Sequence, residues 1–332
     1  MSVGKLLEFL SKTGNVVLSI ALLVSCRGAL LWAQEGDYQK GISYYKQQQY
    51  EKAIEEFEKI VEATPDYESG FKILGDSYLK VKDYEQAADA FKNALRLEKN
   101  NFASHYGLAL AYYNSGRYTE ALSALLESED YAKSPRNQYA LYSTRGSTYY
   151  NLHDFLGAVS DLEEATALQR GDWQNILQLG VSYYHVGDYP KAEQFLQQAL
   201  ALNPSDLVAP EYLGRLKYRE GAAAIEAQDY PRAVELLSDY VSQNPTDGEA
   251  RFNLGLAQLF VDNIRAAEDE FLRTAGLMAT NWEVYDRLGY IYELKGDYLT
   301  SLKNYQKASD LNPNSAIEAS IDRIQERIRR SK

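Results

Sequence analysis

Small, bulky and polar positions recur along this chain with a period of 34 residues. Eight copies lie over one another if three residues at 136–138 and seven at 207–213 are treated as insertions. Within a copy, bulky residues follow small ones by three or four positions, so both lie on one face of an α-helix. The pattern predicts two helices in every copy. The copies begin at Gln34, Glu68, Phe102, Tyr139, Trp173, Gly214, Gly248 and Trp282.

Two columns of small residues stand out. The eighth position of the copies reads Gly41, Gly75, Ala109, Gly146, Gly180, Gly221, Gly255 and Gly289. The twentieth reads Ala53, Ala87, Ala121, Ala158, Ala192, Ala233, Ala267 and Ser301. A glycine inside a helix costs about 1 kcal/mol relative to alanine. Its recurrence in register predicts that the helix backbone bearing it closely approaches the helix bearing the alanine.

Bulky residues accompany both columns and include seven of the 28 tyrosines, in a chain that has only 10 Phe and 3 Trp. The glycine column is followed three residues later by Tyr44, Tyr78, Tyr112, Tyr149, Tyr183 and Tyr292. The alanine column is followed four residues later by Phe57, Phe91, Leu125, Leu162, Leu196, Leu237, Phe271 and Tyr305. We therefore interpret these residues as packing positions. Turns such as Gly187-Asp188-Tyr189 separate the two helices, and Asn-Pro pairs, as at Pro204, close several copies.

The pattern resembles the tetratricopeptide repeat family, with Leu-Gly-x-x-Tyr, then Ala-x-x-x-Phe, then Pro. Leu288-Gly289-Tyr290-Ile291-Tyr292 and Leu74-Gly75-Asp76-Ser77-Tyr78 match it. The resemblance implies an all-α fold, a right-handed α-solenoid of about eight helix-turn-helix units. These are 34–67, 68–101, 102–135, 139–172, 173–206, 214–247, 248–281 and 282–315.

Segments outside the regular copies have local interpretations. The insertion 207–213 is close to two helical turns and predicts a longer first helix in the sixth unit, with Pro210 near its start. Ser134-Pro135-Arg136-Asn137 predicts a longer loop between the third and fourth units. In 316–332, isoleucines at helical spacing predict an amphipathic capping helix that covers the last unit.

The amino terminus carries an export pattern. Asn15 to Val24 is uncharged and apolar at its centre, too short to cross a bilayer comfortably but suited to a signal core. Leu23-Val24-Ser25-Cys26 then resembles the lipobox of bacterial lipoproteins. That resemblance implies a signal peptide at 1–25, lipidation of Cys26, a tether at 26–33 and a membrane-anchored protein facing the periplasm. Several acyl chains would hold it there durably.

Two other interpretations of the terminus remain open. Cleavage after Ala33 would leave a soluble periplasmic protein, and an uncleaved 16–33 would anchor the chain as a helix. Arg27 lies inside the apolar run that both require, which argues against them. All three interpretations export the protein.

The remaining composition narrows the chemistry. A net charge of -12 argues against a nucleic-acid partner, because such proteins need a basic footprint. His105, His153 and His185 occupy unrelated repeat positions, which argues against a metal site. No phosphate loop, serine elbow or metalloprotease helix occurs. We therefore expect a protein that is not an enzyme and has no cofactor.

What remains is the face that the first helices of such a repeat array present to ligands. Its expected partner-binding residues are Tyr106, Leu110, Tyr113, Asn114, Tyr150, Asn151, Leu177, Val181, Tyr184, His185, Phe252, Leu256, Leu259 and Phe260. Large apolar patches on a surface usually bind something. An opposing interpretation is that these residues only pack against neighbouring helices.

The function expected is a non-enzymatic protein-protein interaction scaffold in the bacterial cell envelope, which binds an extended peptide or a helix of its partner. The alternative is an accessory protein that holds a small apolar molecule or a lipid in the aromatic groove. The Lys and Asn pair by which chaperone-binding relatives hold a carboxylate is missing, since the corresponding pairs are Tyr38/Ile42, Lys72/Asp76 and Tyr106/Leu110.

Overall fold

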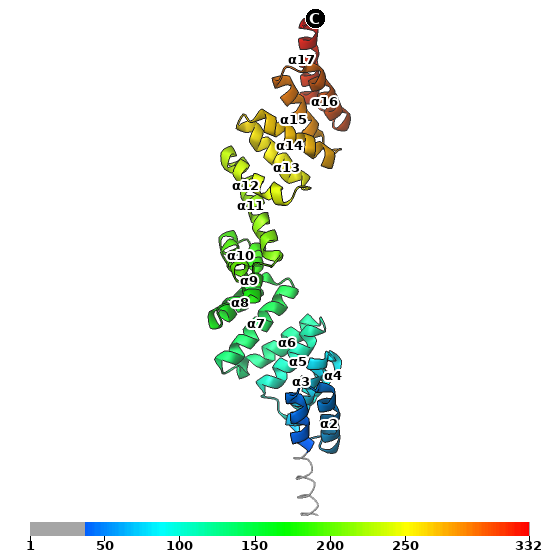
Figure 1. Ribbon diagram of the computed structural model, residues 1–332, viewed down its shortest axis with the longest axis vertical. Helices are drawn as coiled ribbons and strands as arrows, with labels where there is room; N and C mark the ends of the chain where they lie inside the picture. Colours follow the sequence, from blue (N-terminus) through cyan, green and yellow to red (C-terminus); the bar gives the residue numbers. More distant parts are fainter. Residues whose placement is uncertain (1–36, 332) are drawn as a thin grey trace, which may run out of the picture. The chain divides into compact units, whose positions relative to one another are not determined.

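The computed structural model describes residues 37–331, and in this range every regular element is a helix. Figure 1 shows the helices following one another in pairs along the chain. They are a helical segment at 37–46, α2 (Tyr50–Ala63), α3 (Glu68–Val81), α4 (Tyr84–Leu97), α5 (Phe102–Asn114), α6 (Tyr118–Ser128), η1 (Glu129–Tyr131), α7 (Pro135–Asn151), α8 (Phe155–Leu168), α9 (Trp173–Val186), α10 (Tyr189–Leu202), α11 (Val208–Glu226), α12 (Tyr230–Gln243), α13 (Gly248–Phe260), α14 (Ile264–Leu277), α15 (Trp282–Leu294), α16 (Tyr298–Leu311) and α17 (Ser315–Arg330).

The chain divides into two compact units, Met1–Val186 and Gly187–Lys332. In unit 1, α3 packs on α4, α5 on α6, and α7 on α8, and each second helix also contacts the first helix of the next pair. The first helices α3, α5, α7 and α9 contact one another in succession. Unit 2 repeats the arrangement with α11 to α16. The main contacts join helices that are one or two places apart in the chain, as in an α-solenoid, so the expected fold class is confirmed.

One backbone feature recurs in every turn between paired helices. The fifteenth position of each copy has a positive φ, and it is glycine in only three of them. The three are Gly116, Gly187 and Gly296, and the others are Gln48, Lys82, His153, Gln228 and Asp262. In five copies the next residue is an aspartate whose side chain accepts a backbone N–H from the first turn of the following helix. The left-handed residue thus ends one helix and the aspartate caps the next.

The glycine column has a precise steric cause. A Cβ built on Gly75 would lie 2.8 Å from the Phe91 ring, and one on Gly289 would lie 2.7 Å from Tyr305. Gly41, Gly146, Gly221 and Gly255 face the residue sixteen positions later in the same way. The facing small residue approaches the glycine backbone, since the Ser301 hydroxyl donates to the Gly289 carbonyl at 2.7 Å. The close approach predicted from the two columns is therefore present, and a bulky side chain fills the space beside it.

The two insertions behave differently from each other. The seven residues at 207–213 lengthen α11 to 19 residues with Pro210 in its first turn, as predicted. The predicted loop at 134–137 is wrong, because α7 begins at Pro135 and is 17 residues long. Ser134 caps this helix by accepting the Asn137 N–H at 3.1 Å. A serine followed by proline is a helix start, so the three extra residues extend the helix.

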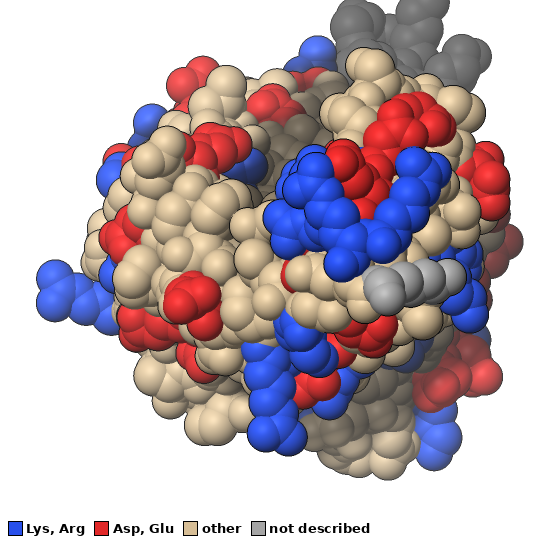
Figure 2. All heavy atoms as spheres, turned by 90° about the horizontal axis from the view of Figure 1, so that it is seen from above, with Lys and Arg blue, Asp and Glu red and all other residues tan. Residues whose placement is uncertain are grey.

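The carboxyl-terminal helix α17 covers unit 2's last helix pair. Ile317, Ile321 and Ile324 are buried against α15 and α16. Arg323 makes two hydrogen bonds of 3.0 Å to the Glu293 carboxylate on α15. Figure 2, viewed toward this end of unit 2, shows basic side chains interspersed with acidic ones. The predicted capping role of this segment is confirmed.

The predicted signal peptide, Cys26 and the tether lie outside the described residues. Within 37–331, none of the helices combines the length and apolar character that crossing a bilayer requires.

Candidate peptide-binding surface

A hollow of about 690 Å³ opens on the face formed by α3, α5 and α7 of unit 1. We call it the α3–α5–α7 hollow. Its lining combines aromatic, aliphatic, amide and charged side chains. These residues are Asp76, Lys80, Phe102, Ala103, Tyr106, Gly107, Leu110, Arg136, Asn137, Tyr139, Ala140 and Gln169.

Aromatic rings make the apolar part of the hollow. Phe102 stacks on Tyr106 one helical turn later on α5, with ring centroids 5.4 Å apart. The Tyr106 hydroxyl hydrogen-bonds to the Thr144 hydroxyl on α7 at 3.0 Å, and burial raises the pKa of Tyr106. On α7, Tyr139 donates to the Asp172 carboxylate. Burial and this carboxylate raise the pKa of Tyr139 to about 12, so both phenols are neutral and their rings are held in place.

Charged side chains surround this aromatic part. Asp76 and Lys80 lie one turn apart on α3, and Arg136 lies in the first turn of α7. Lys80 and Arg136 form no ion pair with any other residue of the described range. Asp76 remains open to solvent, but the protein around it displaces part of its water and raises the pKa of its carboxyl to about 6, against the opposing effect of Lys80 and Lys72. Above that pH, the three groups carry one negative and two positive charges.

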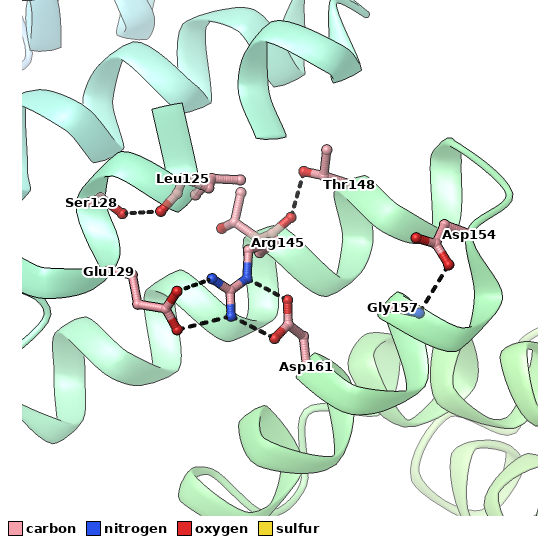
Figure 3. Close-up of polar contacts among 9 residues, drawn as sticks. Leu125, Ser128, Glu129, Arg145, Thr148, Asp154, Gly157 and Asp161 are labelled. Carbon is pink, nitrogen blue, oxygen red and sulfur yellow. Dashed lines mark hydrogen bonds and ion pairs between the residues drawn. The ribbon is translucent and has the colours of Figure 1, made fainter. Parts of the chain in front are cut away.

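A buried ion-pair network fixes the position of α7. Arg145 is 7% exposed and donates to Asp161 on α8 at 2.6 and 2.9 Å. The same guanidinium donates to Glu129 of η1 at 2.9 and 3.3 Å, and Figure 3 shows it held between the two carboxylates. Removing one partner of such a network leaves a buried charge poorly compensated. The network therefore ties α7, and with it Arg136, to both neighbouring elements.

Hydrogen bonds between successive first helices use several of the predicted partner-binding residues. Asn151 donates to the Tyr113 hydroxyl at 3.1 Å, which links α7 to α5. Ser147 donates to Gln178 at 2.7 Å, which links α7 to α9. The polar atoms of Tyr106, Tyr113 and Asn151 thus connect repeats, in agreement with the packing interpretation for these three.

Aromatic stacking accounts for other members of the predicted set. Phe155 lies between Tyr150 and His185, and its ring stacks on His185 with centroids 4.1 Å apart. In unit 2, Tyr230 stacks on Phe260 at 4.4 Å. In both stacks the second residue lies thirty positions after the first.

One predicted partner-binding residue lies away from an accessible surface, and for it the prediction is wrong. Val181 is 1% exposed, so a ligand has no access to it. Phe252, Leu256 and Leu259 are partly buried against the core of unit 2, and their role in binding stays a prediction. Of the rest, Leu110 lines the hollow, Asn114 is exposed beside it, and Leu177 and Tyr184 are half-buried.

The charged residues of the hollow were not predicted as binding residues. Asp76 and Lys80 occupy the ninth and thirteenth positions of the second copy, which are the positions of the predicted binding residues Leu110 and Asn114 in the third copy. The predicted set contained no Asp, Glu, Lys or Arg, although these two positions indicated that Asp76 and Lys80 face a ligand. Arg136 lies in the insertion at 136–138, where the columns give no assignment.

The repeats match several family models, all described as tetratricopeptide repeat. The matched residues are 29–67, 74–137, 177–206, 218–276 and 283–315, which together make up more than half of the chain. The chain belongs to the tetratricopeptide repeat family. Proteins of this family typically mediate protein-protein interactions as non-enzymatic scaffolds.

Solved tetratricopeptide repeat structures resemble parts of the chain. A structure of YrrB, described as a TPR protein with an unusual peptide-binding site, is 19% identical, covers 53% of this chain and 89% of its own, and has a TM-score of 0.47. MamA is 18% identical over 49% of this chain and 94% of its own, with a TM-score of 0.46. The pilF protein of Pseudomonas aeruginosa is 18% identical over 64% and 92%, with a TM-score of 0.46. No curated protein matches the chain.

Proposed function

We propose that this protein is a protein-protein interaction adaptor and that the α3–α5–α7 hollow binds an extended segment of its partner. The observation that supports this most strongly is the lining of the hollow. Stacked rings of Phe102 and Tyr106 offer a flat apolar surface, and Asn137 and Gln169 offer amides that suit a peptide backbone. Phe102 and Tyr106 lie on α5, Asn137 lies on α7, and Gln169 directly follows α8, so regular elements hold these groups and binding needs little reorganisation.

The same lining favours a peptide over the alternative ligand, a small apolar molecule or lipid. Asp76, Lys80 and Arg136 stand around the aromatic part, and an apolar ligand would desolvate these charges without compensating them. A peptide supplies its own polar groups.

Photo-crosslinking tests the adaptor proposal. Ala103 is exposed and lines the hollow, whereas Ala167 is equally small and exposed on α8 outside it. A benzophenone amino acid at Ala103 is expected to give a defined adduct with a partner protein in cells. The adduct should disappear when Phe102→Ser and Leu110→Ser are added. The same adduct from both positions, or an adduct indifferent to these two substitutions, would show that the hollow is not the binding surface.

We further propose that the adaptor works in the bacterial cell envelope, attached through acylated Cys26. The support is the sequence Leu23-Val24-Ser25-Cys26 and the presence of a single cysteine at the end of an apolar run. The Cys26 thiol would serve as the attachment point for a lipid. Two or more acyl chains are needed for stable anchoring.

Substitution of Cys26 tests this placement. Cys26→Ala should move the protein from the membrane to the soluble fraction, and the acylated amino-terminal peptide should be lost from its mass spectrum. Ser25→Ala, a change at the neighbouring residue, serves as the control and should remain membrane-bound. Unchanged partitioning of Cys26→Ala would exclude the lipid anchor while leaving the adaptor proposal intact.

A further inference from the structure

We propose that the α3–α5–α7 hollow selects acidic partner segments: an extended peptide whose apolar side chain lies on the Phe102–Tyr106 stack and whose flanking Asp or Glu carboxylates pair with Lys80 and Arg136. This inference rests on the adaptor proposal and specifies the partner's chemistry.

The first argument is the contrast between these two cations and those bases of unit 1 that are paired within the chain. Lys40, Lys72 and Arg145 are paired with carboxylates of the chain itself. Lys80 and Arg136 have no such partner in the described range, although the protein carries 47 acidic residues. The hollow therefore contains two positive charges and, in Asp76, one negative charge, so one positive charge remains for a carboxylate of the partner to neutralise.

The second argument concerns geometry. Lys80 extends from α3 and Arg136 from the start of α7, with α5 between these helices carrying the ring stack. A peptide laid across the three helices thus meets a cation, an apolar surface and a second cation in that order. An arginine guanidinium binds a carboxylate through two parallel hydrogen bonds, which gives this order directional specificity.

The third argument is the field of the whole protein. A net charge of -12 repels an acidic peptide from most of the surface, so only a locally positive site can hold it. Attraction elsewhere would instead favour basic peptides without regard to the hollow. A preference for acidic segments is therefore a property that the hollow alone can supply.

The experiment uses the full-length protein in detergent and three pools of fluorescent nonapeptides. All have phenylalanine at the centre, and the two positions on each side carry Asp or Glu, Asn or Gln, or Lys or Arg. Binding is measured by fluorescence anisotropy at pH 7.5 in 0.15 M salt. We expect the acidic pool to bind about tenfold more tightly than the neutral pool. Lys80→Gln and Arg136→Gln should each weaken acidic binding about three- to tenfold and leave the neutral pool unchanged.

Lys99→Gln and Arg170→Gln provide the matched control, since both side chains are exposed cations of unit 1 outside the hollow. They should leave every pool unaffected. If the neutral pool binds as well as the acidic pool, and Phe102→Ser abolishes both, the acidic preference is overturned and the adaptor proposal stands. If the control substitutions weaken acidic binding as much as Lys80→Gln, the selectivity does not arise in the hollow. If no pool binds, the hollow is not a peptide site and the adaptor proposal itself fails.

Discussion

At the residue scale, the clearest constraint on this fold is the space around Phe91. Its ring is buried, with Gly75 on one side and Gly107 of the next repeat on the other. A Cβ at Gly107 would lie 2.4 Å from the ring, a distance at which atoms must move. The ring cannot turn away without leaving a cavity between two repeats.

Gly107→Ala is therefore expected to destabilise unit 1 by up to about 2 kcal/mol, because overpacking costs about 1–3 kcal/mol and the better helix propensity of alanine recovers about 1. Gly276→Ala on α14 is the matched control, since nothing lies within 4 Å of its added methyl. That variant should be as stable as the wild type or slightly more so. Urea unfolding followed by circular dichroism measures both. Equal stability of the two variants would show that Phe91 does not confine Gly107.

Residue identity predicted the packing columns well and the ion pairs poorly. Glycine and alanine at fixed spacing predict where the two helices of a repeat approach each other, and the structure places them as expected. The pairs Arg145–Asp161 and Lys40–Glu56 were missed, although each joins residues sixteen positions apart. Both bases stand at the seventh position, where Leu74 and Leu288 are buried in other copies. A Lys or Arg at a repeat position that is usually leucine therefore predicts an ion pair only if the residue sixteen positions later is also examined.

At the element scale, α17 combines apolar burial with a charged clasp. Glu293 of α15 has 9% of its side chain exposed and receives Arg323 and Arg327 from α17. Hydrogen bonds from Arg323 lower the pKa of Glu293. A carboxyl with a lowered pKa in the folded state contributes stability above its unfolded value of about 4.3. That contribution is lost as the pH falls through the lower, folded value.

We expect the wild type to lose stability steeply between about pH 5 and pH 3, and Glu293→Gln to lose less over that interval. At pH 7 the variant should already be less stable, by about 1–2 kcal/mol, because the arginines lose a charged acceptor. Urea midpoints across this pH range give the comparison. Asp322→Asn, at an exposed position of α17, controls for the loss of a carboxylate. A Glu293→Gln profile parallel to that of the wild type would contradict the role of this clasp.

Element boundaries depended on signals of unequal clarity. The two-turn insertion in α11 preserved the helical face and was assigned correctly, whereas three residues at the start of α7 were assigned to a loop. Ser134-Pro135 predicts a helix start at this point, because serine caps a helix and proline favours its first turn.

At the scale of the whole molecule, the repeat period specified the fold class but left the binding surface largely undetermined. Periodicity shows which face a side chain occupies. It does not show whether that face meets solvent or a neighbour about thirty residues away. His185 and Phe260 stack on aromatic rings thirty positions earlier, and Tyr113 bonds to Asn151 of the next repeat. These contacts depend on the displacement between one repeat and the next. The residue pattern within a single repeat does not specify that displacement.

The charge of the whole molecule also shapes the pH dependence of binding in the hollow. Acidification reduces the net charge of -12 and so weakens the general repulsion of acidic peptides. Locally, the pKa of Asp76 is raised to about 6 by partial desolvation, against the opposing charges of Lys80 and Lys72. Its other charged or titratable neighbours are Tyr45 on the 37–46 helix and Arg136 on α7. Protonation of Asp76 changes the charge of the hollow from one net positive to two.

Acidic peptides should therefore bind about three- to tenfold more tightly at pH 5.2 than at pH 7.5, a range in which free Glu side chains stay mostly ionised. Asp76→Asn removes the protonation of Asp76 but leaves the pH dependence of the protein's net charge unchanged. The variant should bind tightly at both values and show only the smaller change due to net charge, which 0.15 M salt screens beyond about 8 Å. Asp89→Asn on α4, an exposed carboxylate outside the hollow, should retain the wild-type profile. An undiminished pH dependence in Asp76→Asn would assign the effect to net charge and remove Asp76 from the site.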